Sequence, residues 1–347
     1  MNSRSFGKLA DGREITLYTL KNSSGMTVTI TDYAGTVVDI IVADKNGGMG
    51  DVSLGFERAA DYEASQTFMG CLVGRHANRI ANAQFVLDGV EYKLAQNDGS
   101  NNLHGGPGGL HSKIWQVDAF TPTTLSLSTS SPDGEEGFPG NIQVQVTYTL
   151  TEDNGLQIDY SATTDRPTIL NMTNHAYFNL AGSGRVDDHE MMMFADQITP
   201  VNEISIPLGH LMPVDQTPFD LRQPRRVGDG LNSAHEQIKL TSGYDHNFVI
   251  RNGGAELVQS AKVFEPTSGR VMEVFTTEPG IQLYTGNFLK GETGKGGQIY
   301  TPHTGLCLET QRFPDSPNNP DFPTAELRPG ETYAQTTVYR FAVIGSD

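Results

Sequence analysis

The segment of residues 141–160 limits most strongly the folds open to this chain. In NIQVQVTYTLT (141–151), apolar side chains recur at every second position and Gln or Thr fills the positions between them. A polar turn, EDNG (152–155), follows, and LQIDY (156–160) resumes the alternation. A period of two with one polar face predicts two antiparallel strands joined by a hairpin.

Shorter runs of the same kind recur along the chain. They cover residues 15–20, 26–31, 36–42, 124–128, 271–277 and 337–343. Glycine and proline are frequent, at 38 and 18 of 347 residues, and helical periodicity is confined to residues 57–65 and 231–236. The pattern predicts an all-β fold: a single large antiparallel β-sandwich with few short helices, forming one domain over residues 1–347. A two-domain all-β protein is the alternative.

The charge balance restricts the partners of the chain. Forty-one acidic residues against 24 Lys and Arg give a formal net charge of −17. This excess argues against nucleic acid and against an anionic membrane surface, and it favours a neutral small molecule. The N-terminus lacks the apolar run of a secretory peptide, and Cys71 and Cys307 lie far apart. We therefore expect free thiols and a cytoplasmic protein.

Several common catalytic motifs do not occur in the sequence. There is no phosphate-binding P-loop, no nucleophile elbow, no dinucleotide-binding glycine motif and no familiar zinc-ligand spacing. These motifs serve phosphoryl, acyl and hydride transfer and metal chemistry. We therefore expect no cofactor and no metal, and the remaining His, carboxylate and Arg side chains suit proton transfer on a neutral ligand.

Four segments concentrate those side chains: GRHANRI (74–80), NNLHGGPGGL (101–110), NMTNHAYFNLAG (171–182) and LETQRFPDSPNNP (308–320). His104 precedes two glycines, which would allow the backbone to approach a ligand closely. Glu309 follows the apolar run 306–308, so burial should raise its pKa. Taken singly, each of these residues is also compatible with an ordinary structural role.

Together the segments resemble the galactose mutarotase (aldose 1-epimerase) family. The motifs GRHANRI, NNLHGG, TNHAYFNL, GYDHNF (243–248), IQLYTGNF (281–288) and LETQRFPDSPN stand in that family's order, and the resemblance runs from about Phe6 to Val343. It implies a single large β-sandwich of the galactose mutarotase type, a cytoplasmic setting and chemistry without a cofactor. It also implies interconversion of the α- and β-anomers of free hexoses such as galactose and glucose.

The resemblance also implies roles for individual residues. Glu309 is expected to be the general base and His175 the general acid at the ring oxygen, with His104 hydrogen-bonding the sugar. The expected substrate-binding residues are Asn78, Arg79, Asp245 and Gln282. A charged histidine beside a carboxylate should support the ionised state of both groups, which places Glu309 on the acidic limb of the pH profile. Tyr177, Phe178 and Phe288 are candidates for packing on the sugar.

Three other functions are compatible with parts of the sequence. A sugar-phosphate epimerase would need an arginine clamp, for which Arg222, Arg225 and Arg226 are the downstream candidates. A carbohydrate-binding module or sugar sensor would not need the acid and the base. A glycoside hydrolase would use two carboxylates, such as Glu309 and Asp245, and would leave both histidines without a role. The sequence leaves the preferred hexose and the oligomeric state open.

Overall fold

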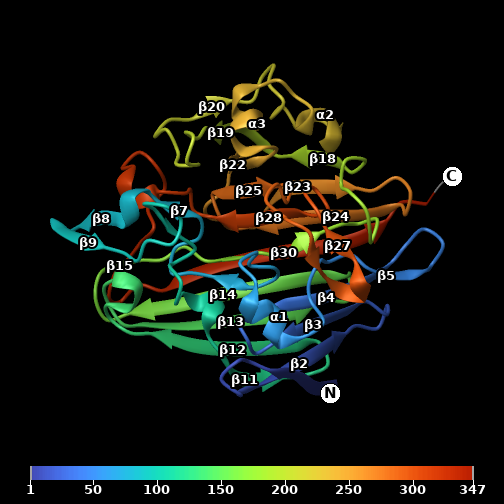
Figure 1. The fold of residues 1–347 in the computed structure, drawn as a ribbon, viewed down its shortest axis with the longest axis horizontal. Helices are drawn as coiled ribbons and strands as arrows, with labels where there is room; N and C mark the ends of the chain where they lie inside the picture. The colour runs from blue at the N-terminus through green and yellow to red at the C-terminus, as the bar shows by residue number, and fades with distance from the viewer. Residues whose placement is uncertain (1, 346–347) are drawn as a thin grey trace.

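Antiparallel sheets are the main secondary structure of the computed structural model, which describes residues 2–345 (Figure 1). Residues 1, 346 and 347 of the expected domain lie outside the described residues. In the three largest sheets every pair of neighbouring strands runs antiparallel. This confirms the predicted all-β, antiparallel class.

The largest sheet has nine strands and runs across the molecule (Figure 1). In spatial order they are β11 (Gln116–Phe120), β12 (Thr124–Ser131), β13 (Ile142–Leu150), β14 (Gly155–Thr164), β30 (Tyr333–Val343), β24 (Arg270–Thr276), β23 (Val258–Phe264), β18 (Glu190–Met193) and β21 (Arg225–Arg226). The long C-terminal strand β30 joins the two halves of this sheet, because it pairs with β14 on one side and β24 on the other.

Two smaller sheets pack against the nine-stranded sheet. The six-stranded sheet runs β17 (Tyr177–Phe178), β28 (Leu306–Gln311), β25 (Gly280–Tyr284), β22 (Asp245–Ile250), β19 (Ala195–Thr199) and β20 (Met212–Pro213). The five-stranded sheet runs β1 (Asn2–Lys8), β2 (Glu14–Lys21), β3 (Thr27–Thr31), β4 (Val37–Ala43) and β5 (Met49–Asp51).

One apolar core connects all three sheets. Val28 of β3, Val146 of β13 and Phe248 of β22 belong to the same buried cluster. Buried tyrosines add hydrogen bonds between the layers: Tyr339 of β30 donates to the Leu308 carbonyl of β28 (2.8 Å), and Tyr148 of β13 donates to the Gly35 carbonyl (2.6 Å). The face-to-face packing of sheets over a shared core confirms the predicted β-sandwich.

The predicted hairpin forms strands β13 and β14. Burial alternates along β13 as the sequence period requires, with Ile142, Val144 and Val146 inward and Gln143 and Gln145 exposed. Leu150 pairs with Leu156 across the turn. The six shorter predicted strands correspond to β2, β3, β4, β12, β24 and β30. Alternation therefore identified these strands correctly because one face of each is buried and the other is not.

Within residues 2–345, three short α-helices connect the strands. The prediction for residues 57–65 is confirmed by α1 (Ala59–Ala64), whereas the prediction for residues 231–236 is wrong. That segment links α2 (Val227–Leu231) to α3 (Glu236–Thr241). Its polar residues cap the two helices: Asn232 donates to the Gly228 carbonyl, and His235 accepts from the Gln237 amide. Capping side chains end and begin helices.

None of the helices in residues 2–345 has the length and apolar character needed to cross a membrane. The same part of the chain contains Cys71 and Cys307, both buried and both free, which confirms the expected absence of a disulfide between them.

Candidate active site

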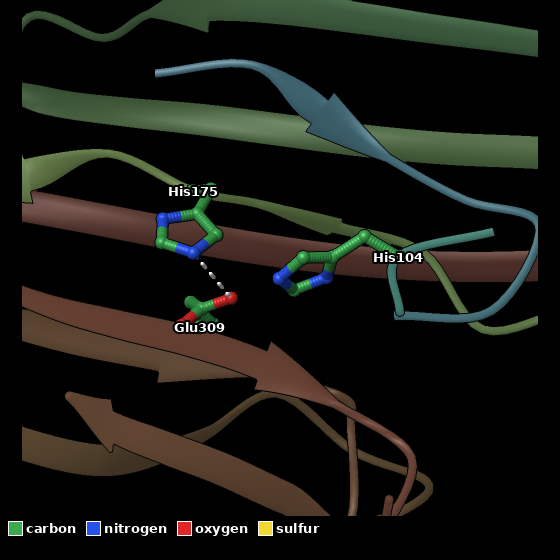
Figure 2. A group of neighbouring side chains, drawn as sticks. All are labelled: His104, His175 and Glu309. Carbon is green, nitrogen blue, oxygen red and sulfur yellow. Dashed lines mark ion pairs between the residues drawn. The ribbon is translucent and has the colours of Figure 1, made fainter. Parts of the chain in front are cut away.

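A cavity of about 140 Å³ lies where β28, β25 and β22 meet loops from the first half of the chain. Six of the seven expected site residues line it: Asn78, Arg79, His104, His175, Asp245 and Glu309. They come from segments far apart in sequence, so the cavity exists only in the folded chain. Figure 2 shows Glu309 on β28 with the rings of His175 and His104 directed toward its carboxylate.

Glu309 is held on a central strand of the six-stranded sheet. β28 lies between β17 and β25, and Glu309 pairs with Gln282 of β25. Its side chain is buried, and among residues 2–345 its Oε2 atom has no hydrogen-bond partner. Burial raises the pKa of Glu309 well above its usual range, and the nearby charge of Asp245 raises it further, while Arg79 opposes both. A carboxylate in this environment has a high proton affinity, as a general base requires.

His175 faces Glu309 from the short link between β16 (Thr173–Asn174) and β17. Its backbone is fixed on both sides, because His175 N donates to the Cys71 carbonyl and Gly70 N donates to the His175 carbonyl. Nε2 lies 3.6 Å from Glu309 Oε2 (Figure 2). Burial lowers the pKa of His175 to about 4.

The His175–Glu309 pair therefore differs from the sequence-based expectation in one respect. The two groups lie within ion-pairing distance, as expected, but burial opposes the charge on each of them. Burial favours the form of the pair with neutral histidine and protonated glutamate, so the two groups together hold one proton between the pKa of His175 and that of Glu309. A pair that holds one proton contains one group that can give a proton and one that can take a proton, as acid–base catalysis on a bound ligand requires.

His104 follows β10 (Asn102–Leu103) with a positive φ of 55°. Its Nδ1 accepts a hydrogen bond from the backbone N–H of Asn78 (3.1 Å). Burial lowers the pKa of His104 well below its usual value, and the neighbouring His175 lowers it further. A neutral imidazole with an acceptor at Nδ1 carries its proton on Nε2. His104 therefore presents a hydrogen-bond donor to the cavity.

The glycines after His104 have a structural purpose that differs from the expected one. Gly105 has a φ of 86°, and a Cβ there would lie 2.1 Å from the Gly74 carbonyl oxygen. A Cβ on Gly106 would lie 2.4 Å from the Glu136 carboxylate. The glycines were expected to admit a ligand. In the structure, Gly105 instead lets the His104 loop approach the backbone at Gly74 closely, and this packing fixes the loop beside the segment that precedes Asn78.

Hydrogen bonds to carboxylate groups hold two of the expected sugar-binding residues in place. Arg79 Nε donates to Asp98 at 2.7 Å, and Asp245 is buried and accepts from Gln282 Nε2 at 2.7 Å. Gln282 itself does not line the cavity; it lies behind Asp245 and its Oε1 accepts from Gln311 Nε2 (3.3 Å). Of the seven expected residues, Gln282 is thus the one that does not line the cavity.

Aromatic side chains form much of the remaining wall. Tyr177 and Phe288 line the cavity, as expected, whereas Phe178 is buried against Tyr339 in the core (ring centroids 5.0 Å apart). Tyr284 and Phe68 also line the cavity, and the sequence analysis did not identify either. Tyr284 stands two residues after Gln282 on β25, a spacing that could have indicated it. Phe68 lies in a loop that carries no such pattern.

The other arginines lie elsewhere. Arg75, from the same motif as Arg79, is buried and donates to the carbonyls of Ser131, Pro132 and Pro139. Arg222 pairs with Asp215 and Asp220, and Arg226 pairs with Asp188. None of these arginines lines the cavity, and neither does Arg225, so the cluster considered as a phosphate clamp does not reach Glu309. The arginine in the cavity wall is Arg79, which is paired with Asp98.

The donor atoms of His104, His175 and Glu309 all lie within 4.8 Å of one another, which is close enough for a shared metal ion. The hydrogen bond at His104 Nδ1 argues against this use. Metal-bound histidine needs a lone pair on the coordinating nitrogen and a donor N–H on the other. His104 presents the reverse arrangement to the cavity, so the three residues do not fit a resident metal.

Comparisons with known proteins identify the family of the chain. The profile of the aldose 1-epimerase family matches residues 16–340. The galactose mutarotase of Bos taurus is 46% identical over 329 residues, covering 92% of each chain, and the aldose 1-epimerase of Escherichia coli is 38% identical over 334 residues, covering 95% of this chain and 96% of the relative. The solved structure of an aldose epimerase homologue from C. elegans superposes with a TM-score of 0.88 at 33% identity, covering 95% of this chain and 99% of the other. The chain belongs to the aldose 1-epimerase family.

Proposed function

We propose that this protein is an aldose 1-epimerase, an isomerase that interconverts the α- and β-anomers of free hexoses such as galactose and glucose without a cofactor. One observation carries the proposal. Glu309 and His175, a buried carboxyl group and a buried imidazole, lie 3.6 Å apart in a cavity lined by hydroxyl-binding side chains and aromatic rings. Ring opening needs one proton removed and one supplied at neighbouring oxygens of the sugar.

Glu309 accepts the proton of the anomeric hydroxyl while His175 donates a proton to the ring oxygen. The bond between C1 and the ring oxygen breaks, and the open-chain aldehyde forms. Rotation about C1–C2 then presents the other face of the aldehyde. The hydroxyl at the former ring oxygen attacks C1, His175 takes its proton back, and Glu309 returns its proton to the new anomeric oxygen. No charge accumulates on the sugar, because each proton loss accompanies a proton gain.

The reactive form of the pair has Glu309 ionised and His175 protonated. It has the same number of protons as the form with neutral histidine and protonated glutamate, which burial favours. The sugar hydroxyl and ring oxygen replace water as hydrogen-bond partners of the two groups, which permits the proton to move between them. The Oε2 atom of Glu309, unpartnered within the protein, gains a donor when the anomeric hydroxyl binds.

The remaining residues orient the sugar. In this proposal His104 donates its Nε2–H to a sugar oxygen, and Asn78, Arg79 and Asp245 bind hydroxyls. Gln282 holds the carboxylate of Asp245 from behind, so its contribution to substrate binding is indirect. Tyr177, Tyr284 and Phe288 offer faces for the apolar side of the ring. Directed hydrogen bonds from such groups match the hydroxyls of a hexose.

Polarimetry with freshly dissolved α-D-galactose and α-D-glucose tests the proposal directly. Catalytic amounts of protein should speed the change in optical rotation above the buffer rate. A hexose 6-phosphate as substrate and an aryl glycoside as reporter of hydrolysis distinguish the two rival enzymes. Absence of acceleration with every free aldose would leave the binding module or sugar sensor as the better interpretation.

We further infer that residues 1–347 form one domain and that the protein works in the cytoplasm. The single buried cluster shared by the three largest sheets supports the first inference. The two free cysteines support the second, because reducing compartments preserve thiols.

A further inference from the structure

A second strand residue contacts the same imidazole as Glu309. Cys307 stands two positions before Glu309 on β28, so both side chains project from the same face of the strand. Glu309 Oε2 lies 3.6 Å from Nε2 of His175, and Cys307 Sγ lies 3.6 Å from Nδ1. The two ring nitrogens of His175 are thus each in contact with one residue of a Cys-x-Glu sequence.

We infer that Cys307 is a positioning residue that acts through His175. Its thiol donates a hydrogen bond to Nδ1 and so keeps the ring hydrogen on Nε2. When the ring is protonated, the sulfur is only a weak hydrogen-bond acceptor for the Nδ1–H. The inference rests on the proposed function, because it assigns His175 the transfer of a proton from Nε2. It adds a residue to that mechanism which does not touch the sugar.

The protonation state of the thiol follows from its surroundings. Cys307 is fully buried, and burial together with the charge of Glu309 raises its pKa well above the usual value. The sulfur therefore keeps its hydrogen and can donate to an imidazole lone pair. With Nδ1 accepting, the neutral ring must carry its hydrogen on Nε2, the nitrogen that faces Glu309 and the cavity.

The same contact affects the charged form of the ring. When His175 gains a second proton, its Nδ1–H meets a sulfur atom, which accepts hydrogen bonds poorly. A carboxylate at this position would stabilise the imidazolium and weaken it as an acid. A thiol stabilises it little, so the protonated ring readily gives up its Nε2 proton.

The other groups around His175 do not supply an alternative acceptor at Nδ1. Glu309 faces the opposite nitrogen, and the Arg79 and Asp245 charges act on Glu309. The titratable rings that face His175 are His104 from the loop after β10, Tyr177 from β17 and Tyr284 from β25, with ring centroids 5.3, 5.2 and 6.3 Å away. Among residues 2–345, Cys307 is thus the hydrogen-bond partner of His175 Nδ1.

Long-range ¹H–¹⁵N NMR of the histidine rings tests the first part of the inference without any sugar. The His175 signals are identified by their loss in His175→Asn. We expect the pattern of an Nε2–H ring in the unmodified protein and a mixture of the two tautomers in Cys307→Ala. A ring with its hydrogen on Nδ1 in the unmodified protein would overturn the inference.

A comparison of Cys307→Ser with Cys307→Ala tests the second part. A hydroxyl accepts from a charged N–H more strongly than sulfur does, so Cys307→Ser should raise the pKa of His175 by about one, and Cys307→Ala should not. In polarimetric kinetics the acidic limb should move upward in the serine variant alone, with kcat about fivefold lower and KM nearly unchanged. If the acidic limb of the pH–rate profile and the NMR titration of His175 are the same in the two variants, Cys307 has only a packing role.

Cys71→Ser is the matched control. Cys71 is also a buried thiol, but its sulfur donates to the Phe68 carbonyl at 3.1 Å, and within residues 2–345 no hydrogen bond joins it to the His175 ring. This variant should leave the His175 titration unchanged, and melting curves of all three variants verify that they fold. If polarimetry finds no activity while the NMR results are as expected, the proposed function fails and the structural role of Cys307 stands. If the enzyme is active and the NMR results differ, only this inference fails.

Discussion

Gln282 Nε2 donates to Asp245 Oδ1 across 2.7 Å, and both side chains are buried. The contact makes Gln282 the support of a cavity residue rather than a wall of the cavity. Asp245 has a raised pKa, chiefly from burial, and the amide partly offsets this by stabilising the charged form. The hydrogen bond therefore affects both the orientation and the charge of the Asp245 carboxylate.

Gln282→Leu should weaken sugar binding more than turnover. Loss of a hydrogen bond to a buried carboxylate costs about 1.5–3 kcal/mol, so we expect KM for galactose to rise by about tenfold or more, with a smaller change in kcat. Gln311→Leu removes the next residue of the network and leaves the Gln282–Asp245 bond in place, so its effect should be smaller. Steady-state polarimetry on both variants measures the difference. Equal effects in the two variants would contradict a specific support of Asp245.

Glu309→Gln should remove the base while keeping its shape. Loss of a positioned acid or base typically lowers turnover by about 10²- to 10⁴-fold. Sugar titration should still show binding, because an amide also hydrogen-bonds a hydroxyl. His175→Asn should behave in the same way, whereas His104→Asn and Arg79→Ala should weaken binding as well. Near-normal turnover in Glu309→Gln would exclude the proposed mechanism.

The pH dependence of kcat/KM should be flat from just above pH 4 up to the raised pKa of Glu309. In this range the Glu309–His175 pair holds one proton, because burial raises the pKa of Glu309 well above its usual range and lowers that of His175 to about 4. Below about pH 4 a second proton binds and the base is lost, while above the pKa of Glu309 the last proton leaves and the acid is lost. This order reverses the expectation from sequence, which gave the acidic limb to Glu309. An acidic limb near pH 6.5 would favour a solvated His175.

Folding stability should fall as the pH decreases from about 6.5 toward 4. Burial lowers the pKa of His76 and His246 to about 3 and that of His189 to about 4, so the unfolded chain binds protons that the folded chain does not. Each such histidine costs about 2 kcal/mol at pH 5. Glu278 acts in the opposite direction, since burial raises its pKa to about 7. Melting temperatures measured between pH 7 and pH 5 test the balance, and a constant melting temperature would contradict it.

Exhaustive treatment with a chelator should leave the mutarotation rate unchanged. The Asn78 N–H at His104 Nδ1 leaves that ring without a lone pair toward Glu309. Added zinc should therefore give no increase in rate. Activity that vanishes on chelation and returns with zinc would show that the His104 ring binds a metal after all. Measuring the rate before treatment, after it and after adding zinc provides the comparison.

The sequence predicted elements whose two faces differ and residues that carry distinctive chemistry. Strands β13 and β14 could be recognised because their inward positions are apolar and their outward positions polar. The position of Gln282 could not, because whether a polar residue on a fully buried strand touches the cavity or its neighbour depends on packing between strands. Phe68 could not be identified either, because it lies on a loop and reaches the cavity only through the fold.

Two errors have a common origin. The segment 231–236 has the composition of a helical turn, and the glycines after His104 have that of a ligand-binding loop. In both cases the decisive neighbour is one that the local pattern does not reveal. Asn232 donates to the Gly228 carbonyl, and Gly105 packs so closely on the Gly74 carbonyl that a Cβ would not fit. Local composition describes what a segment can do, and its neighbours decide which of these possibilities is realised.

Strand β28 places Cys307 and Glu309 toward His175, while Leu306 and Leu308, which alternate with them along the strand, lie in the main core. A shift of this strand by one residue would exchange the two sets, putting leucines in the cavity and a carboxylate in the core. Catalytic geometry and cohesion of the fold therefore depend on the same pairing with β25. A change in the pairing of β28 would therefore disrupt the core together with the active site. On heating, the loss of activity should coincide with unfolding.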